Sequence, residues 1–305
     1  MSQAATKKKK RLGREELTLN LMILPGLIIL IIFVFAPLVG SLMAFENYVP
    51  AKGLLKSKWV GLSNFEFIFS LPDSKQVFMN TLIIAFSKLV VNIFVPVTFA
   101  ILLNEIRVNV CKKIFQTVVY LPHFLSWVVL ATVVTNMFSL DGPINAVISA
   151  FGGNPIYFLA DNKWFRTVIV GTDVWKEFGY NSVVYLAALT GIDPGLFEAA
   201  SIDGANRFKQ ILNITVPALL PTVVLMTALN LGNILNAGFD QVFNLYNPIV
   251  YETGDIIDTY VYRIGMVECQ YSIGTAVGLL KSVISFVLIL SANKLAQKTT
   301  GSGIF

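Results

Sequence analysis

Six long runs of apolar residues, separated by shorter polar segments, organise the chain. The runs cover about 19–45, 78–103, 114–138, 167–189, 216–236 and 274–295. A transmembrane α-helix needs about 20 predominantly apolar residues, so each run is long enough to cross a bilayer. The pattern therefore predicts an all-α, polytopic membrane protein with six transmembrane helices.

The polar segments divide the chain into three parts. A basic N-terminus over 1–18 precedes a membrane domain over 19–298, and a short tail covers 299–305. A basic stretch before an apolar run can belong to a signal peptide. The first run is too long for that and has no nearby small-residue cleavage site, so we expect an uncleaved first span.

The composition fits a membrane protein. The 305 residues are 55% hydrophobic and 13% charged, whereas a soluble domain is about 25% charged. Cys111 and Cys269 are expected on opposite sides of the bilayer, so neither a disulfide nor a metal site is indicated. One histidine, no P-loop motif and no acid–base pair of carboxylates argue against an enzyme and against a cofactor bound by this chain.

The basic residues predict which ends of the spans face the cytoplasm. Segments 1–18, 104–113, 190–215 and 294–305 hold 13 Lys and Arg residues. Segments 46–76, 139–166 and 237–273, which are expected as loops on the opposite side, hold seven. Cytoplasmic loops are enriched in Lys and Arg, so both termini are expected inside the cell. The net charge of +5 therefore reflects membrane topology and does not indicate nucleic acid.

The polar segment 198–217 lies between two apolar runs, on the predicted cytoplasmic side. A short helix should begin at Asp193, a good N-cap, with Pro194 in its first turn. Gly204 can adopt the left-handed conformation that ends a helix, and a second short helix is expected near 206–212. The segment could be an ordinary amphipathic connector or a docking element for a partner.

The spacing of this segment resembles the EAA motif of binding-protein-dependent ABC importer permeases, EAA-x3-G-x9-I-x-L-P. The matching residues are Glu198, Ala199, Ala200, Gly204, Ile214 and Pro217, and Val216 replaces the leucine. The resemblance implies a type I importer permease fold and a coupling helix over 193–204 that docks on an ATPase. The residues it assigns to this coupling are Glu198, Ala199, Ala200, Asp203 and Gly204.

The same resemblance implies partners and a location. It implies a bacterial plasma-membrane complex of this chain with a second permease, a cytoplasmic ATPase dimer and an external solute-binding protein. ATP and Mg²⁺ would be bound by the ATPase partner. The complex would move a sugar across the lipid bilayer by alternating access.

Charged and polar side chains within the fourth and fifth runs are candidates for contact with cargo. Asp173, Lys176, Glu177 and Tyr180 follow one another at helical spacing, and charges in a bilayer core must pair or face water. They could be a charged anchor at the outer end of the helix or the wall of a wet path. Asn230, Asn233 and Asn236 could bind sugar hydroxyls or neighbouring helices.

The resemblance favours the second alternative, a wet path for cargo. In the maltose-type permease of this family, sugar is contacted from the helices before and after the coupling segment, at positions that match Asp173, Lys176, Glu177, Tyr180, Asn230 and Asn233. Trp127 and Trp175 are candidates for stacking on sugar rings, or they pack in the core or at the interface. The chain also resembles the polysaccharide branch of carbohydrate permeases, which includes importers of pectin oligosaccharides.

That branch resemblance rests on segments 120–127 and 236–241, on Asn247-Pro248, and on segment 255–263. An oligosaccharide is therefore the expected cargo. Lys176 could pair with a uronate carboxylate, or it could already be neutralised by Asp173 and Glu177 beside it. The alternative is a secondary transporter driven by an ion gradient, which often shows an inverted repeat. No such repeat is visible in the sequence.

Overall fold

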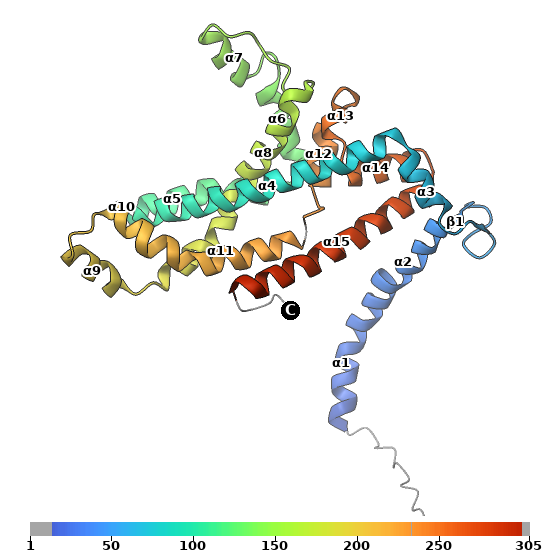
Figure 1. Ribbon diagram of the computed structural model, residues 1–305, viewed down its shortest axis with the longest axis horizontal. Helices are drawn as coiled ribbons and strands as arrows, with labels where there is room; N and C mark the ends of the chain where they lie inside the picture. The colour runs from blue at the N-terminus through green and yellow to red at the C-terminus, as the bar shows by residue number, and fades with distance from the viewer. Residues whose placement is uncertain (1–13, 233, 301–305) are drawn as a thin grey trace, which may run out of the picture.

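The computed structural model describes residues 14–232 and 234–300, and the fold is all-α, as predicted. The described strands are a two-residue antiparallel pair, β1 (Glu46–Asn47) and β2 (Lys58–Trp59). The α-helices, shown in Figure 1, are α1 (Arg14–Leu30), α2 (Ala36–Val39), α3 (Ser63–Ser70), α4 (Pro72–Glu105), α5 (Asn109–Tyr120), α6 (Trp127–Phe138), α7 (Pro143–Ala150), α8 (Asn162–Thr190), α9 (Pro194–Ile202), α10 (Arg207–Gln210), α11 (Val216–Leu231), α12 (Phe239–Leu245), α13 (Tyr251–Gly254), α14 (Ile257–Tyr262) and α15 (Tyr271–Thr300).

Five helical segments in the described part of the chain are long and apolar enough to cross a membrane. They are Thr18–Phe45, Pro72–Glu105, Trp127–Ala150, Arg207–Leu231 and Tyr271–Ser291. A sixth candidate combines α8 with α9, which meet at an angle of 69°. The apolar side chains that these helices expose suit a lipid environment, where the backbone must satisfy its own hydrogen bonds.

The run predicted as one span at 114–138 is not a continuous helix. It consists of the end of α5, a 3-10 turn over Leu121–Phe124, and α6. Pro122 is buried in this turn, and its missing N–H suits the start of a new turn better than the interior of a helix. The chain therefore changes direction where the sequence Leu121-Pro122-His123 indicates an interruption.

The long helices pack around α4. It lies against α8 along much of its length and also contacts α11, which in turn contacts α15. By contrast α1, at the blue end of the chain, diverges from the other helices (Figure 1), and none of its apolar stretch is buried within this chain. That helix is therefore left to contact lipid or another subunit.

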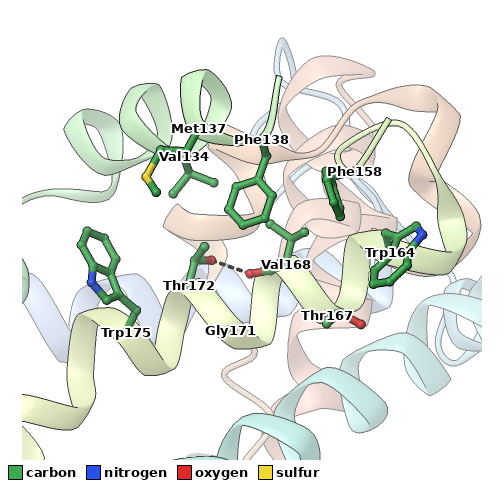
Figure 2. A pocket seen from close by; sticks show the side chains of 10 residues that line it. All are labelled: Val134, Met137, Phe138, Phe158, Trp164, Thr167, Val168, Gly171, Thr172 and Trp175. Atoms are coloured by element: carbon green, nitrogen blue, oxygen red, sulfur yellow. Dashed lines mark hydrogen bonds between the residues drawn. The ribbon is translucent and has the colours of Figure 1, made fainter. Parts of the chain in front are cut away.

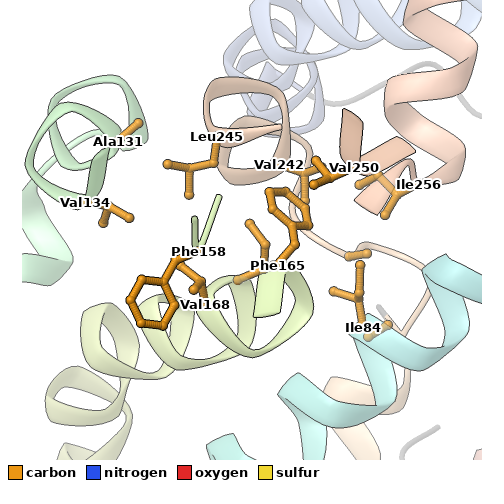
Figure 3. Packing of buried hydrophobic residues seen from close by; sticks show 13 residues of the cluster. Ile84, Ala131, Val134, Phe158, Phe165, Val168, Val242, Leu245, Val250 and Ile256 are labelled. Atoms are coloured by element: carbon orange, nitrogen blue, oxygen red, sulfur yellow. The ribbon is translucent and has the colours of Figure 1, made fainter. Parts of the chain in front are cut away.

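The largest hydrophobic cluster joins distant parts of the sequence (Figure 3). Ile84 of α4, Val134 of α6 and Phe165 of α8 meet residues from α12 and the segment that follows it. Phe165 and Ile84 are fully buried. The segment 237–273, expected as a loop, is therefore a set of short helices packed on α4 and α8.

Polar contacts fix this segment in place. The side-chain amide of Asn80 on α4 donates to the carbonyl oxygens of Glu252 and Asp255, both at 3.1 Å, and Arg166 of α8 donates to Asn80 Oδ1 at 2.7 Å. The Asp255 carboxylate accepts from Arg263. Burial raises the pKa of the Asp255 carboxyl, and hydrogen bonds from Arg263 and Thr259 oppose that rise.

Close contact between α5 and α8 gives a test of this packing. A Cβ added at Gly179 would collide with the Val119 carbonyl oxygen, whereas one added at Gly171 on the same helix meets nothing within 4 Å. We expect Gly179→Ala to cost on the order of 2 kcal/mol by overpacking. Gly171→Ala should be neutral or stabilise by up to about 1 kcal/mol. Thermal unfolding of the purified protein in detergent measures both, and equal melting temperatures would contradict this packing.

Candidate functional site

A polar cleft of about 210 Å³ lies close to the middle of α4 and α8. Polar and charged side chains at the centre of spanning helices are costly and usually functional. The residues lining this cleft are Ala85, Lys88, Leu89, Asn92, Asp173, Glu177, Asn181, Asn230, Ile234, Asn236 and Gly238. They come from α4, α8, α11 and the linker 234–238, which joins α11 to α12 without helical structure.

Lys88 connects three of these elements. Its ammonium lies 2.9 Å from Asp173 Oδ1 on α8 and donates to the Ala237 carbonyl oxygen at 2.8 Å and to Gln241 Oε1 at 2.5 Å. An ammonium has three N–H donors, so every donor has an acceptor. Gln241 in turn donates to the Ile169 carbonyl oxygen and to Thr172 Oγ1. These bonds join α4, α8 and the linker in one buried network.

Asn92 lies one helical turn beyond Lys88 on α4. Its amide nitrogen donates to Asp173 Oδ2 at 3.0 Å, so both oxygens of that carboxylate are bound. The side-chain oxygen of Asn92 is buried and has no hydrogen-bond partner. Buried polar groups are normally paired, so this oxygen is an unsatisfied acceptor on a residue that lines the cleft.

A second charged group lies on α8 beside the first. Glu177 Oε1 lies 3.2 Å from Lys176 Nζ, and Glu177 Oε2 lies 2.7 Å from His123 Nδ1. Lys176 also donates to the His123 carbonyl oxygen at 2.6 Å. The His123 ring stacks on Tyr180, with centroids 3.9 Å apart and planes 2° from parallel. This group ties the turn between α5 and α6 to α8.

The structure separates the cargo candidates predicted from sequence. Asp173, Glu177 and Asn230 line the cleft. Tyr180 is 48% exposed and stacked on His123. Asn233 lies outside the described residues. Lys176 does not line the cleft, because its buried side chain turns toward His123 and its ammonium lies 6.0 Å from the Trp127 ring.

Trp175 lies in a different place from the cleft. It lines an apolar pocket of about 400 Å³ between α6 and α8, together with Val134, Met137 and Phe158 (Figure 2). Successive residues of an α-helix point about 100° apart, so Trp175 faces away from Asp173 and Glu177 on α8. Its stacking on a sugar ring stays a prediction, and the structure places Trp175 in this apolar pocket and not in the polar cleft.

A second lysine holds the linker from the other side. Lys281 of α15 donates to Asn236 Oδ1 at 2.9 Å and to Asp258 Oδ1 of α14 at 2.5 Å. Irregular backbone at membrane depth is tolerated only where protein or a water-filled cavity surrounds it. The linker meets this condition, since Lys88 and Lys281 bind adjacent residues in it. Lys281 was not among the residues selected from sequence, although a lysine inside an apolar run was a signal for it.

The polar segment after α8 forms a compact elbow, which we define as residues 193–215. The Asp193 side chain accepts from Gly195 N at 2.9 Å and caps α9, and Gly204 has a φ of +78°, both as predicted. The predicted second helix is α10, capped by Asn206 and continued by a π-helical turn over Ile211–Thr215. The motif residues therefore adopt the local structure expected from their sequence.

Side chains that were not selected from the sequence stiffen the elbow. Gln210 is buried and donates to Ser201 Oγ at 2.8 Å, which connects α10 to α9. Arg207 Nε lies 2.7 Å from Glu105 Oε2 at the end of α4, and its Nη1 donates to Gln210 Oε1. The elbow is therefore attached to α4 by an ion pair as well as to α8 through the chain.

The outer surface of the elbow presents apolar and small residues. Ile202 is 87% exposed, and Leu196 and Phe208 are exposed as well. Glu198 and Ala199 lie exposed on α9 beside them. Exposed apolar patches mark sites of interaction with a protein or membrane. Within the described part of the chain, no group of three His, Cys, Asp or Glu side chains is placed to hold a metal.

The pairing of Lys176 with Glu177 gives a test of the charged cluster. Glu177→Gln should leave a buried ammonium without its counter-charge and cost roughly 3 kcal/mol, because breaking such a pair from one side leaves an uncompensated charge. The double variant Lys176→Met/Glu177→Gln removes both charges and should recover most of that loss. Thermal unfolding of the three proteins in detergent measures the difference. A single variant as stable as the parent would contradict the pairing.

Two relatives from Bacillus subtilis (strain 168) match nearly the whole chain. The polygalacturonan/rhamnogalacturonan transport system permease protein YteP is 41% identical over 94% of this chain and 90% of its own length. Protein LplB is 41% identical over 94% of this chain and 91% of its own.

Solved structures and a family model agree with these relatives. A bacterial ABC transporter involved in the import of the acidic polysaccharide alginate contains a chain that is 36% identical, with a TM-score of 0.86 over 94% of this chain and 97% of that one. A bacterial alginate ABC transporter in complex with an alginate pentasaccharide-bound periplasmic protein gives a TM-score of 0.87 at the same identity, over 95% of this chain and 98% of that one. Residues 93–301 match the model of the binding-protein-dependent transport system inner membrane component. The chain belongs to this family of transport permeases and shares its type I importer fold.

Proposed function

We propose that this chain is a permease subunit of an ATP-driven importer that moves an oligosaccharide into a bacterial cell. The observation that carries the proposal is that one helix, α8, supports both the charged cleft and the elbow. Asp173 and Glu177 lie near its middle, and its end bends by 69° into α9. A movement applied to the elbow is therefore delivered to a wall of the cleft.

The elbow is the proposed contact with the ATPase. Glu198, Ala199, Ala200, Asp203 and Gly204 lie on or directly after α9, with Ile202 among them. The bond between Arg207 and Glu105 carries the same movement to α4, which bears Lys88 and Asn92. Both walls of the cleft would then shift together when the ATPases close. Cargo would shift the balance between inward-facing and outward-facing states only through its different affinity for each.

The proposed cargo is an oligosaccharide that contains uronate residues. The cleft offers the side-chain amides of Asn92, Asn181, Asn230 and Asn236, and each amide supplies both donors and an acceptor for hydroxyl groups. Relatives of this chain are named for polygalacturonan and rhamnogalacturonan and for alginate. Their names support an acidic sugar for this chain too.

The proposed assembly places the chain among other proteins. A second permease would complete the transmembrane path, a pair of ATPases would bind ATP and Mg²⁺, and an external binding protein would deliver the sugar. This chain would hydrolyse nothing itself. The N-terminus (1–18), the elbow and the tail (299–305) would lie in the cytoplasm. An ion-gradient-driven transporter would have no use for the elbow surface that we assign to an ATPase.

The two exposed cysteines give a native test of this topology. Cys111 lies in the first turn of α5, on the proposed cytoplasmic side, and Cys269 lies before α15 on the proposed outer side. A membrane-impermeant maleimide applied to intact cells should label Cys269 and spare Cys111. Labelling should therefore disappear in Cys269→Ser and persist in Cys111→Ser. Labelling of Cys111 before the cells are opened would place the elbow outside and refute the proposal.

Two glycines with the same backbone conformation test the coupling role of the elbow. Gly204 and Gly152 have φ values of +78° and +79°, and neither would crowd an added Cβ. An alanine at either site pays a similar conformational cost, about 1 kcal/mol. We expect Gly204→Ala to lower ATP-driven sugar uptake several-fold while the complex still assembles, because the elbow is distorted.

Gly152→Ala, in the loop after α7, is the matched control and should transport like the parent protein. Uptake into proteoliposomes and ATP hydrolysis are measured on the same preparations. Equal uptake by both variants would show that the shape of the elbow does not matter for coupling.

A further inference from the structure

Lys88 holds three partners, and a molecule in the cleft can replace only one of them. Ala237 and Gln241 are fully buried, and Gln241 is fixed by its own bonds to α8. Asp173 is different, because it lines the cleft and its side chain is 17% exposed. Of the described residues that line the cleft, Lys88 alone carries a positive charge.

We propose that Lys88 recognises a carboxylate of an acidic sugar by exchanging its Asp173 partner for that carboxylate. This inference deepens the proposed function and rests on it. The exchange replaces one anion by another, so the buried ammonium keeps its counter-charge, which it must do in a low-dielectric site. A neutral sugar offers hydroxyl groups only and cannot make this replacement.

The surroundings of Asp173 allow the exchange. Its second oxygen accepts from Asn92 Nδ2 at 3.0 Å, so the displaced carboxylate keeps one hydrogen bond. The unpartnered Asn92 Oδ1 lies one helical turn from Lys88, where it can accept from a hydroxyl of the same sugar. The neighbouring carboxylate, Glu177, is neutralised by Lys176 and adds little net charge to the cleft.

The other two lysines of the spans do not have this arrangement. Lys176 turns away from the cleft toward His123, so the geometry favours Lys88 over Lys176 as the group that meets a uronate. Lys281 binds Asn236 and Asp258 and does not line the cleft. Lys281 holds the linker much as Lys88 does but does not line the cleft. A variant at Lys281 is therefore a control that separates loss of the linker contact from loss of sugar recognition.

The exchange of partners at Lys88 would also affect the position of the elbow. Lys88 keeps its bonds to Ala237 and Gln241 while α8 loses its ion pair with α4. Helix α8 would then be held to α4 by the Asn92–Asp173 hydrogen bond and through Gln241, without the ion pair. It would be freer to move against α4, and it continues into α9. A bound acidic sugar would in this way favour the conformation that the importer reaches when the ATPases close.

The test uses the assembled importer in proteoliposomes, with its binding protein, and two probes of equal length: trigalacturonate and its neutral methyl ester. The readout is KM and the maximal rate of ATP-driven uptake for each probe. Because the same binding protein delivers each probe to every variant, its own preference cancels in the ratio of variant to parent.

Asp173→Asn removes the competing anion and should lower KM for the acid about tenfold, with little change in KM for the ester. A tenfold change corresponds to the low end of the coupling energies measured for close charge pairs. Lys88→Gln should abolish the preference for the acid, and Lys88→Arg should restore part of it. Asn92→Asp replaces the amide that donates to Asp173 by a carboxylate and so adds negative charge beside Lys88, which should raise KM for the acid more than for the ester. Lys281→Gln should change both probes in the same proportion.

Two results would overturn the inference. The first is that Asp173→Asn, Lys88→Gln and Asn92→Asp all affect acid and ester alike, as Lys281→Gln is expected to do, which would make Lys88 a structural contact only. The second is ATP-driven uptake of the ester, by the parent importer, without uptake of the acid. A parent importer that takes up neither probe with ATP would instead refute the proposed function, and the inference with it.

Discussion

A charge inside a bilayer must find a partner, and this requirement fixes how the helices of this protein meet. Three lysines lie well inside apolar runs, and each ammonium is paired with a carboxylate. The pairs are Lys88 with Asp173, Lys176 with Glu177, and Lys281 with Asp258. Removing one member would leave a buried charge, which is far more costly than removing both. The first and third pairs join different helices, so they set the registration of α4 on α8 and of α14 on α15.

The same pairs make an irregular stretch of backbone possible at membrane depth. The linker 234–238 forms no helix, and a non-helical backbone exposed to lipid would leave costly unpaired groups. Lys88 binds the carbonyl oxygen of Ala237, and Lys281 binds the side chain of Asn236 next to it. Gly238 allows this approach, because a Cβ there would lie 2.8 Å from the Lys88 ammonium. The cleft exists because the linker is held between α4 and α15, which are joined by ion pairs to α8 and α14 respectively.

Features that depend on neighbouring residues could be predicted from the sequence, and features that depend on distant residues could not. Apolar runs indicated most of the spans, and the caps of the elbow followed from Asp193 and Gly204 because these motifs are local. The segment 237–273 looked like a loop because its helices are too short to show a period. They are stabilised by contacts with α4 and α8 such as those of Asn80.

The cleft shows the same limit in finer detail. Spacing alone placed Asp173, Lys176 and Glu177 on one face of a helix, but residue 176 lies at the edge of that face, and its long side chain reaches His123 instead. Trp175 lies on the opposite side and enters an apolar pocket. The partner of Asp173 is on α4, far away in the sequence. No periodicity relates such residues, so only the packing of α4 on α8 identifies Lys88.

One continuous helix, α8, joins the cleft to the elbow, and that geometry limits how the two can affect each other. A helix of 29 residues rises about 1.5 Å per residue and transmits displacement along its length. Its middle is held to α4 by an ion pair, and its end is held to α4 indirectly through Arg207 and Glu105. A change at the Lys88–Asp173 pair should therefore change the forces on the Arg207–Glu105 pair, and the reverse. In a transporter this means that cargo and motor need no separate pathway between them, since each acts on the position of α8 relative to α4.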